Sequence, residues 1–199
     1  MAENKFPKVL LWSLLGVFVL AIIAAAVISQ AHKSRADIPV YGQIPPFEFV
    51  TQNNRPFGTS NLQGKITVLD FMFTNCQGPC PIMSGKMGRL YDQYSDASDV
   101  QFVSISVDPA RDSLKALQQY AKAHGVTDNR WVFLRGPLEE VKHLSVDGLK
   151  LGGNFPMGHS TRFVLIDRKG QIRGYYTGTD DASIDVLKTH LNQLLKTQA

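Results

Sequence analysis

The sequence predicts an α/β protein, with a central mixed β-sheet flanked by helices and preceded by one N-terminal transmembrane helix. Two observations predict it: strand-like and helix-like patterns alternate along most of the 199 residues, and a long charge-free segment lies near the N-terminus. A chain of this length accommodates one ordinary domain plus an appendage. We expect a cytoplasmic N-terminus at residues 1–8, a transmembrane anchor at 9–28, a linker at 29–46 and the folded domain at 47–199.

The charge-free segment, residues 9–28, has Ser13 as its one polar side chain. A helix of twenty residues is about 30 Å long, which matches the hydrocarbon core of a bilayer. The rival interpretation is a cleaved signal peptide, whose apolar region usually has about 7–15 residues. Basic residues flank both ends in near balance, and the free amino terminus slightly favours a folded domain outside the cytoplasm.

The folded domain alternates predicted strands and helices. Strands are expected at residues 47–50, 65–73, 100–107 and 131–134, followed by a hairpin over 161–176. One helix is expected from Pro81, and another has Pro137 in its first turn. The segment from Asp108 opens with turn residues and continues as a helix on Leu114, Leu117 and Ala121. A last helix carries its apolar residues on one side: Ile184, Leu187, Leu191, Leu194 and Leu195. This order implies a partly parallel sheet with helices on both faces. Because a hairpin and a helix close the chain, the arrangement is thioredoxin-like. That fold carries its functional cysteines after the first core strand, and the segment at this place, residues 74–83, contains both cysteines of the chain.

Composition excludes one class of function. Lys and Arg number 21 against 17 Asp and Glu, for a net charge of +4, and these charges are scattered along the chain. A nucleic-acid-binding protein would gather its basic residues in a stripe with interleaved aromatic side chains. We therefore expect no nucleic-acid partner.

Both cysteines of the chain, Cys76 and Cys80, lie in the segment TNCQGPCPIM. Pro81 favours an extended Cys80 that caps the following helix, where unpaired N–H groups and the helix dipole would favour a thiolate. A structural disulfide would close only a short loop and would stabilise the fold little. Dithiol oxidoreductases of this fold use C-x-x-C, and the peroxidase motif fails because Leu69 and Phe73 occupy its proline and Thr/Ser positions.

The wider spacing of the two cysteines favours a metal site, because it suits two thiolates that approach a single ion. Two thiolates favour Cu(I), whereas Zn²⁺ normally takes four ligands. His159 is the candidate third ligand, because it sits in a glycine-rich loop that would face the cysteine loop in a thioredoxin-like fold. The other histidines are interpreted as surface or packed residues: His32, His124, His143 and His190. Of the methionines, Met157 is a further candidate, whereas Met72, Met83 and Met87 are expected in the core.

The segments FTNCQGPCP, SISVDPARDS and GHS resemble the SCO/SenC family of membrane-anchored, thioredoxin-like proteins. The resemblance implies copper bound by Cys76, Cys80 and His159. It also implies a role in building the dinuclear copper site of cytochrome c oxidase subunit II, in contact with other copper chaperones, from the periplasmic side of a bacterial inner membrane. Two departures from the family pattern affect Cu(II) more than Cu(I): Gly158 replaces an acidic residue before the histidine, and the cysteines enclose Gln-Gly-Pro.

The sequence therefore leads to a copper-binding assembly factor rather than an enzyme with turnover. In this hypothesis Cys76 and Cys80 hold Cu(I) as thiolates and His159 closes the site. The alternative is a thiol–disulfide oxidoreductase that reduces partner cysteines during oxidase assembly, with Cys76 and Cys80 as its redox-active pair. A third possibility is a copper-dependent regulator or redox sensor. For Asp108, Arg111 and Asp112 we expect capping of the helix that follows them rather than chemistry.

Overall fold

The computed structural model describes residues 8–33, 38–155 and 158–197. The chain divides into two units, Met1–Asp37 and Ile38–Ala199. The second unit begins nine residues before the predicted domain boundary. It includes part of the predicted linker, because residues 42–43 form a strand that joins the sheet.

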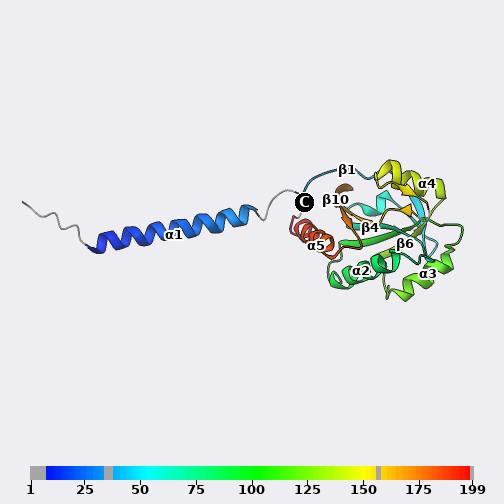
Figure 1. Cartoon of the computed structure of the whole chain (residues 1–199), viewed down its shortest axis with the longest axis horizontal. Coiled ribbons are helices and arrows are strands. Elements are labelled where there is room, and N and C mark those ends of the chain that lie inside the picture. The colour runs from blue at the N-terminus through cyan, green and yellow to red at the C-terminus, as the bar shows by residue number, and fades with distance from the viewer. Residues whose placement is uncertain (1–7, 34–37, 156–157, 198–199) are drawn as a thin grey trace, which may run out of the picture. The chain divides into compact units, whose positions relative to one another are not determined.

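The first unit contains one helix, α1 (Lys8–Lys33), over the predicted anchor (Figure 1). Large apolar side chains of α1 are exposed: Leu10, Trp12, Leu14, Leu15, Val17, Phe18, Val19, Leu20, Ile22 and Ile23. Scored over the described residues, however, no helix combines the length and the apolarity needed to cross a membrane. The transmembrane part of the fold prediction is thus not confirmed and stays a prediction.

The second unit is built on an eight-stranded mixed sheet with the order β1-β10-β9-β4-β5-β6-β2-β3. Its strands are β1 (Gly42–Gln43), β2 (Glu48–Thr51), β3 (Pro56–Gly58), β4 (Ile66–Met72), β5 (Val100–Ser106), β6 (Trp131–Arg135), β9 (Arg162–Ile166) and β10 (Gln171–Thr177). The central strands β4, β5 and β6 are parallel, and the outer strands pair antiparallel. The predicted mixed, thioredoxin-like sheet is confirmed.

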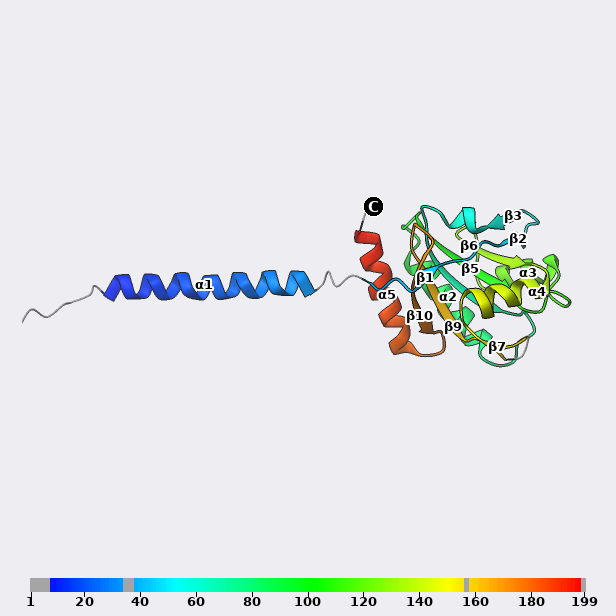
Figure 2. The ribbon, with the colours of Figure 1, turned by 90° about the horizontal axis from the view of Figure 1, so that it is seen from above.

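The strands β4 and β5 lie at the centre of the sheet, and their apolar sequences suit this position. All seven residues of each strand are buried, as expected for strands covered on both faces. The helices of this unit are α2 (Cys80–Gln93), α3 (Leu114–Ala123), α4 (Leu138–Lys142) and α5 (Asp181–Lys196), with a 3-10 helix at Thr59–Leu62 and a π-helix at His143–Gly148. Figure 1 shows α2 and α3 on one side of the sheet and α4 on the other, and in Figure 2, seen from above, these helices overlap the strands.

Helix α5 packs on the same side as α2. The Nζ of Lys86 lies 2.8 Å from a carboxylate oxygen of Asp181 at the start of α5. The Tyr94 hydroxyl donates a hydrogen bond of 3.1 Å to the Asn192 side chain farther along α5. The predicted helices on both faces are confirmed, although the helix expected after Pro137 continues as a π-helix rather than as one α-helix.

Candidate metal and dithiol site

The cysteine loop connects the end of β4 to the start of α2. Cys80 is the first residue of α2, and Pro79 is its N-cap with φ −73° and ψ −22°. The prediction that Cys80 is an extended cap residue is therefore wrong. Pro79 already has helical torsions, and the Met83 N–H donates to the Pro79 carbonyl at 3.0 Å, so the first turn begins one residue earlier than Pro81 alone suggests.

The two thiols differ in accessibility. Both cysteines are free, with Cys80 buried and Cys76 half-buried. Gly78 lies beside the Cys76 sulfur, where a Cβ at position 78 would make only an ordinary contact, 4.0 Å from that Sγ. Of the pair, Cys76 is therefore the thiol that another protein can reach.

Burial keeps the Cys80 thiol protonated. It raises the pKa of Cys80 to about 12, and the neighbouring Cys76 thiol adds to that rise. A backbone hydrogen bond at Phe73 acts in the opposite direction, and the Asp70 carboxylate contributes a smaller increase. The expected low-pKa thiolate at the helix N-terminus is therefore wrong for Cys80, because desolvation outweighs the helix dipole.

His159 is brought to Cys80 by a second small sheet. It lies in β8 (Gly158–His159), which pairs antiparallel with β7 (Gly153–Asn154), so that His159 stands opposite Gly153. The imidazole is buried, and its Nδ1–H donates to the Ser160 carbonyl at 3.0 Å. Its Nε2 lies 3.6 Å from the Cys80 Sγ. The ring also packs edge-on against Phe73, with centroids 5.7 Å apart.

The protonation of His159 suits a metal ligand. Burial lowers the pKa of His159, which favours the neutral imidazole, and the hydrogen bond to Ser160 opposes this only in part. Because Nδ1 carries the proton donated to the Ser160 carbonyl, the lone pair is on Nε2, the nitrogen that faces Cys80.

The distance between these two atoms fits a shared ion. With metal–sulfur and metal–nitrogen bonds of about 2.3 and 2.05 Å, as for Zn²⁺, and an angle near 110–120°, the two ligand atoms would lie about 3.5–3.8 Å apart. The observed separation is 3.6 Å. Among the described residues, no three Cys, His, Asp or Glu side chains are already grouped to hold a metal ion. The Cys76 thiol already neighbours Cys80, so a three-ligand set requires these side chains to shift when an ion binds.

Gly158 has a steric role beside the histidine. A Cβ at position 158 would lie 3.0 Å from the Asn154 carbonyl oxygen and 3.3 Å from the Asn154 nitrogen. A side chain here would press on β7, the strand that positions His159. The close approach of the two strands accounts for glycine where the resemblance leads one to expect an acidic residue.

The other histidines have partners elsewhere. His124 follows α3 as its C-cap, where its ring packs against Tyr120 with centroids 4.5 Å apart and burial lowers its pKa. His143 is exposed at the start of the π-helix, and the Nδ1 of His190 shares a hydrogen bond of 2.7 Å with the Tyr176 hydroxyl. The side chain of His32 falls outside what the structure describes.

The methionines divide in the same way. Met72, Met83 and Met87 are buried in the hydrophobic core, as predicted. Met157 lies outside the described residues, so the prediction about it stays a prediction.

Asp70 is a candidate functional residue that sequence reasoning missed. This β4 residue is buried, and neither carboxyl oxygen makes a well-formed hydrogen bond within the described part of the chain. Burial raises the pKa of Asp70 to about 7, and Ser104 on the neighbouring strand counteracts this only in part. The signal was present in the sequence, since an aspartate interrupts the otherwise apolar segment VLDFMF.

The VDPARD segment, residues 107–112, does not cap the helix that follows it. Ser113 is the N-cap of α3, and its hydroxyl accepts a hydrogen bond from the Ala116 N–H at 3.2 Å. The expected capping role of Asp108 and Asp112 is therefore wrong. Asp108 forms an ion pair with Arg111 at 2.7 Å, while Asp112 is fully buried and bonded to the cysteine loop.

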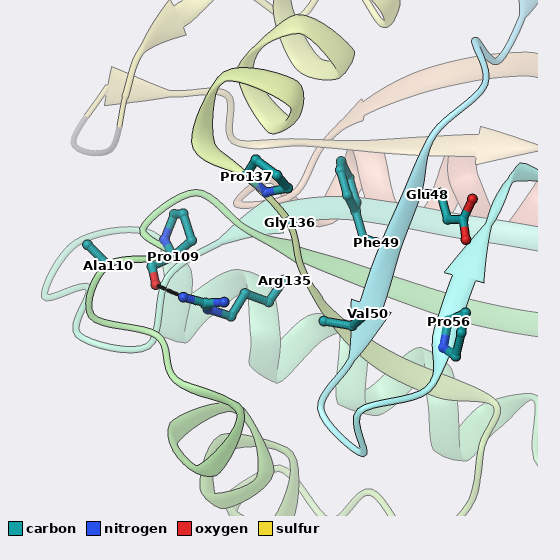
Figure 3. Close-up of a pocket in the computed structure, with 9 residues that line it drawn as sticks. All are labelled: Glu48, Phe49, Val50, Pro56, Pro109, Ala110, Arg135, Gly136 and Pro137. Carbon is teal, nitrogen blue, oxygen red and sulfur yellow. Dashed lines mark hydrogen bonds between the residues drawn. The ribbon is translucent and has the colours of Figure 1, made fainter.

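A pocket of about 660 Å³ lies beside the same segment, and none of the three predicted ligands lines it. Figure 3 shows its lining residues, Glu48, Phe49, Val50, Pro56, Pro109, Ala110, Arg135, Gly136 and Pro137. Arg135 crosses the pocket to donate two hydrogen bonds, of 3.1 and 2.9 Å, to the Pro109 carbonyl. This interaction fixes the VDPARD segment to the end of β6.

The fold and the site together define a class: a thioredoxin-like domain whose first core helix begins at a C-x-x-x-C pair faced by a distant histidine. The SCO1/SenC family model matches residues 39–196, and the chain belongs to this family.

Three solved structures agree with this assignment. A SCO1/SenC family lipoprotein from Bacillus anthracis is 34% identical, with a TM-score of 0.73 over 80% of this chain and 98% of that one. BsSco, described as a member of the Sco family of cytochrome c oxidase assembly proteins with a disulfide switch, is 25% identical, with a TM-score of 0.69 over 79% and 96%. Arabidopsis thaliana ScoI, solved with copper bound, is 26% identical, with a TM-score of 0.63 over 75% and 98%.

Proposed function

We propose that this protein is a copper-binding assembly factor for cytochrome c oxidase. In this proposal Cys76, Cys80 and His159 bind copper and the chain helps to build the dinuclear copper site of oxidase subunit II, after receiving copper from another chaperone. The observation that carries the proposal is the 3.6 Å separation between Cys80 Sγ and a neutral His159 Nε2. The copper-bound ScoI structure and the described role of BsSco support it.

Copper is the cargo of the site, and proton release accompanies its binding. The Cys80 thiol is protonated without an ion because burial raises its pKa to about 12. A soft cation replaces that proton, since the thiolate is the form that binds metal. Cys76, being half-buried, can then pass the ion to thiolates of a partner by ligand exchange.

A second candidate function is reduction of a partner's disulfide. The difference in accessibility between the two free cysteines favours Cys76 as the attacking thiolate. It would form a mixed disulfide and release one partner thiol; Cys80 would then attack the Cys76 sulfur, giving the Cys76–Cys80 disulfide and a second partner thiol. Only copper binding requires His159 as a ligand, so its substitution should lower copper affinity more than thiol exchange.

The proposal includes the location. Residues 9–28 would anchor the chain in a bacterial inner membrane, with residues 1–8 in the cytoplasm and the folded domain on the periplasmic side. The absence of charge in this segment supports the anchor, as do the exposed apolar side chains along α1.

The test is an anaerobic titration of the reduced chain with Cu(I), in competition with a strong chelator. We expect one copper ion per chain, lost when either cysteine is replaced by serine. Variants that bind copper as the wild type does would refute copper binding by this site.

A further inference from the structure

A buried carboxylate connects the cysteine loop to the neighbouring strand. Asp112 is fully buried, and its Oδ1 accepts a hydrogen bond of 2.6 Å from the Thr74 hydroxyl. Its Oδ2 accepts one of 2.5 Å from the Ser106 hydroxyl at the end of β5. The Thr74 N–H lies 3.2 and 3.3 Å from the two oxygens. A buried carboxylate is tolerated when it is hydrogen-bonded in this way, so breaking the set carries a cost.

Asp112 stands on a segment that is itself held in place. The Val107 N–H donates to the Met72 carbonyl at 2.9 Å, and the Asp112 N–H donates to the Asp108 carbonyl at 2.9 Å. From the other side, Arg135 donates two hydrogen bonds to the Pro109 carbonyl (Figure 3). Asp112 therefore presents its carboxylate to the cysteine loop from a fixed position.

Thr74 is the point at which this support reaches the thiols. It lies two residues before Cys76, and within the described chain it is the last residue before Cys76 that is hydrogen-bonded to another segment. Cys80 and His159 are held by α2 and β8, whereas Cys76 depends on the loop. The bond between Thr74 and Asp112 therefore restricts where the Cys76 sulfur can go.

We propose that Asp112 is the positioning residue of the dithiol pair, setting through Thr74 how readily Cys76 reaches Cys80 and His159. The copper part of this proposal rests on the proposed function. The thiol part does not, because it concerns the equilibrium between the Cys76–Cys80 dithiol and its disulfide, whichever cargo the protein carries. Asp112 touches neither the ion nor a sulfur in this account.

The test is a double-mutant cycle on the full chain with Thr74→Val and Asp112→Asn. The primary measurement is the dithiol–disulfide equilibrium of Cys76 and Cys80 against glutathione, with Cu(I) affinity measured in parallel. Each single variant should shift the equilibrium constant about fivefold or more, and the double variant no further than the larger single one, as for two members of one hydrogen-bond network. Thr74→Ser, which keeps the hydroxyl, should restore the wild-type value.

Ser106→Ala is the matched control, because it removes the other hydroxyl partner of the same carboxylate without touching the cysteine loop. It should leave the equilibrium within about twofold of wild type. Three results for the equilibrium constant would each overturn the proposal. The shifts of the two single variants could add in the double variant, Ser106→Ala could shift the constant as much as Thr74→Val, or Thr74→Val could leave it unchanged. If Asp112→Asn does not fold, Thr74→Val and Thr74→Ser alone decide it. If the wild type binds no copper but the variants show the expected shifts in the dithiol–disulfide equilibrium, the proposed function is refuted and the positioning role of Asp112 is retained.

Discussion

The Nε2 atom of His159 lies 3.6 Å from the Sγ of Cys80, although the two residues are 79 positions apart in the chain. Two separate elements of the fold produce this contact: the N-terminus of α2 positions the thiol, and the paired strands β7 and β8 position the imidazole. The first prediction concerns the imidazole.

His159→Ala should weaken Cu(I) binding by about tenfold or more, because the variant loses a nitrogen ligand. Competition with a chelator measures this affinity. His143→Ala is the matched control, since His143 is exposed and stands apart from the thiols in the sequence and in the fold. Equal affinity in the His159 and His143 variants would remove His159 from the site.

The buried Cys80 thiol predicts a pH dependence of stability. Its pKa is raised from 9.0 to about 12 in the folded chain, so the unfolded chain loses this proton at lower pH. The stabilisation is therefore complete below pH 9 and is lost as the pH rises toward 12. Urea unfolding at pH 7 and pH 10 should show a smaller loss of stability in Cys80→Ala than in the reduced wild type. An equal loss in both would contradict burial as the cause.

Asp70 predicts a second pH effect, at lower pH. Burial raises its pKa from 3.8 to about 7, so stability is present below pH 4 and is lost as the pH rises through 7. Asp70→Asn should therefore stabilise the protein at pH 8 by about 2 kcal/mol or more, since one unit of pKa shift corresponds to about 1.4 kcal/mol. The gain should vanish near pH 4. A variant that is destabilised at pH 8 would show that the charged carboxylate is better supported than the structure indicates.

Gly158→Ala should disturb the histidine without changing any ligand. The added Cβ would press on the Asn154 backbone at 3.0 Å, and such overpacking costs about 1 kcal/mol or more. We expect copper affinity to fall several-fold in a chelator competition. Gly85→Ala in α2 is the control, because its Cβ would meet nothing closer than 4.0 Å. Unchanged affinity in Gly158→Ala would mean that β8 adjusts freely.

The membrane anchor gives a prediction of another kind. If residues 9–28 span the membrane, the full chain should stay with membranes during alkaline carbonate extraction and keep its N-terminus. A soluble species that begins near residue 32 would identify a cleaved signal peptide instead.

Sequence reasoning predicted the order of the elements well because the spacing of apolar residues differs clearly between the strands and the helices. The apolar segments of β4 and β5 and the one-sided stripe of α5 are signals of this kind. The proximity of His159 to the cysteine loop was also predictable from the sequence, since the topology of a thioredoxin-like sheet determines which loops face each other. The short strand β1 escaped notice because two residues carry no period, and only the pairing with β10 defines it.

The properties of the site that were mispredicted depend on packing. The helix N-terminus favours a thiolate at Cys80, but the extent of its burial comes from segments distant in sequence, and burial reverses the expected pKa shift. Asp112 was expected to cap the nearest helix, whereas its main partner, Thr74, lies 38 positions away in the chain. Local pattern identifies which residues are unusual, but not which distant groups they contact.

X-ray absorption spectroscopy of the copper-loaded chain identifies the atoms that bind the ion. We expect Cu(I) bound by two sulfur atoms and one imidazole nitrogen in the wild type, with the nitrogen signal absent in His159→Ala. A spectrum with sulfur ligands alone, unchanged by that substitution, would contradict the account.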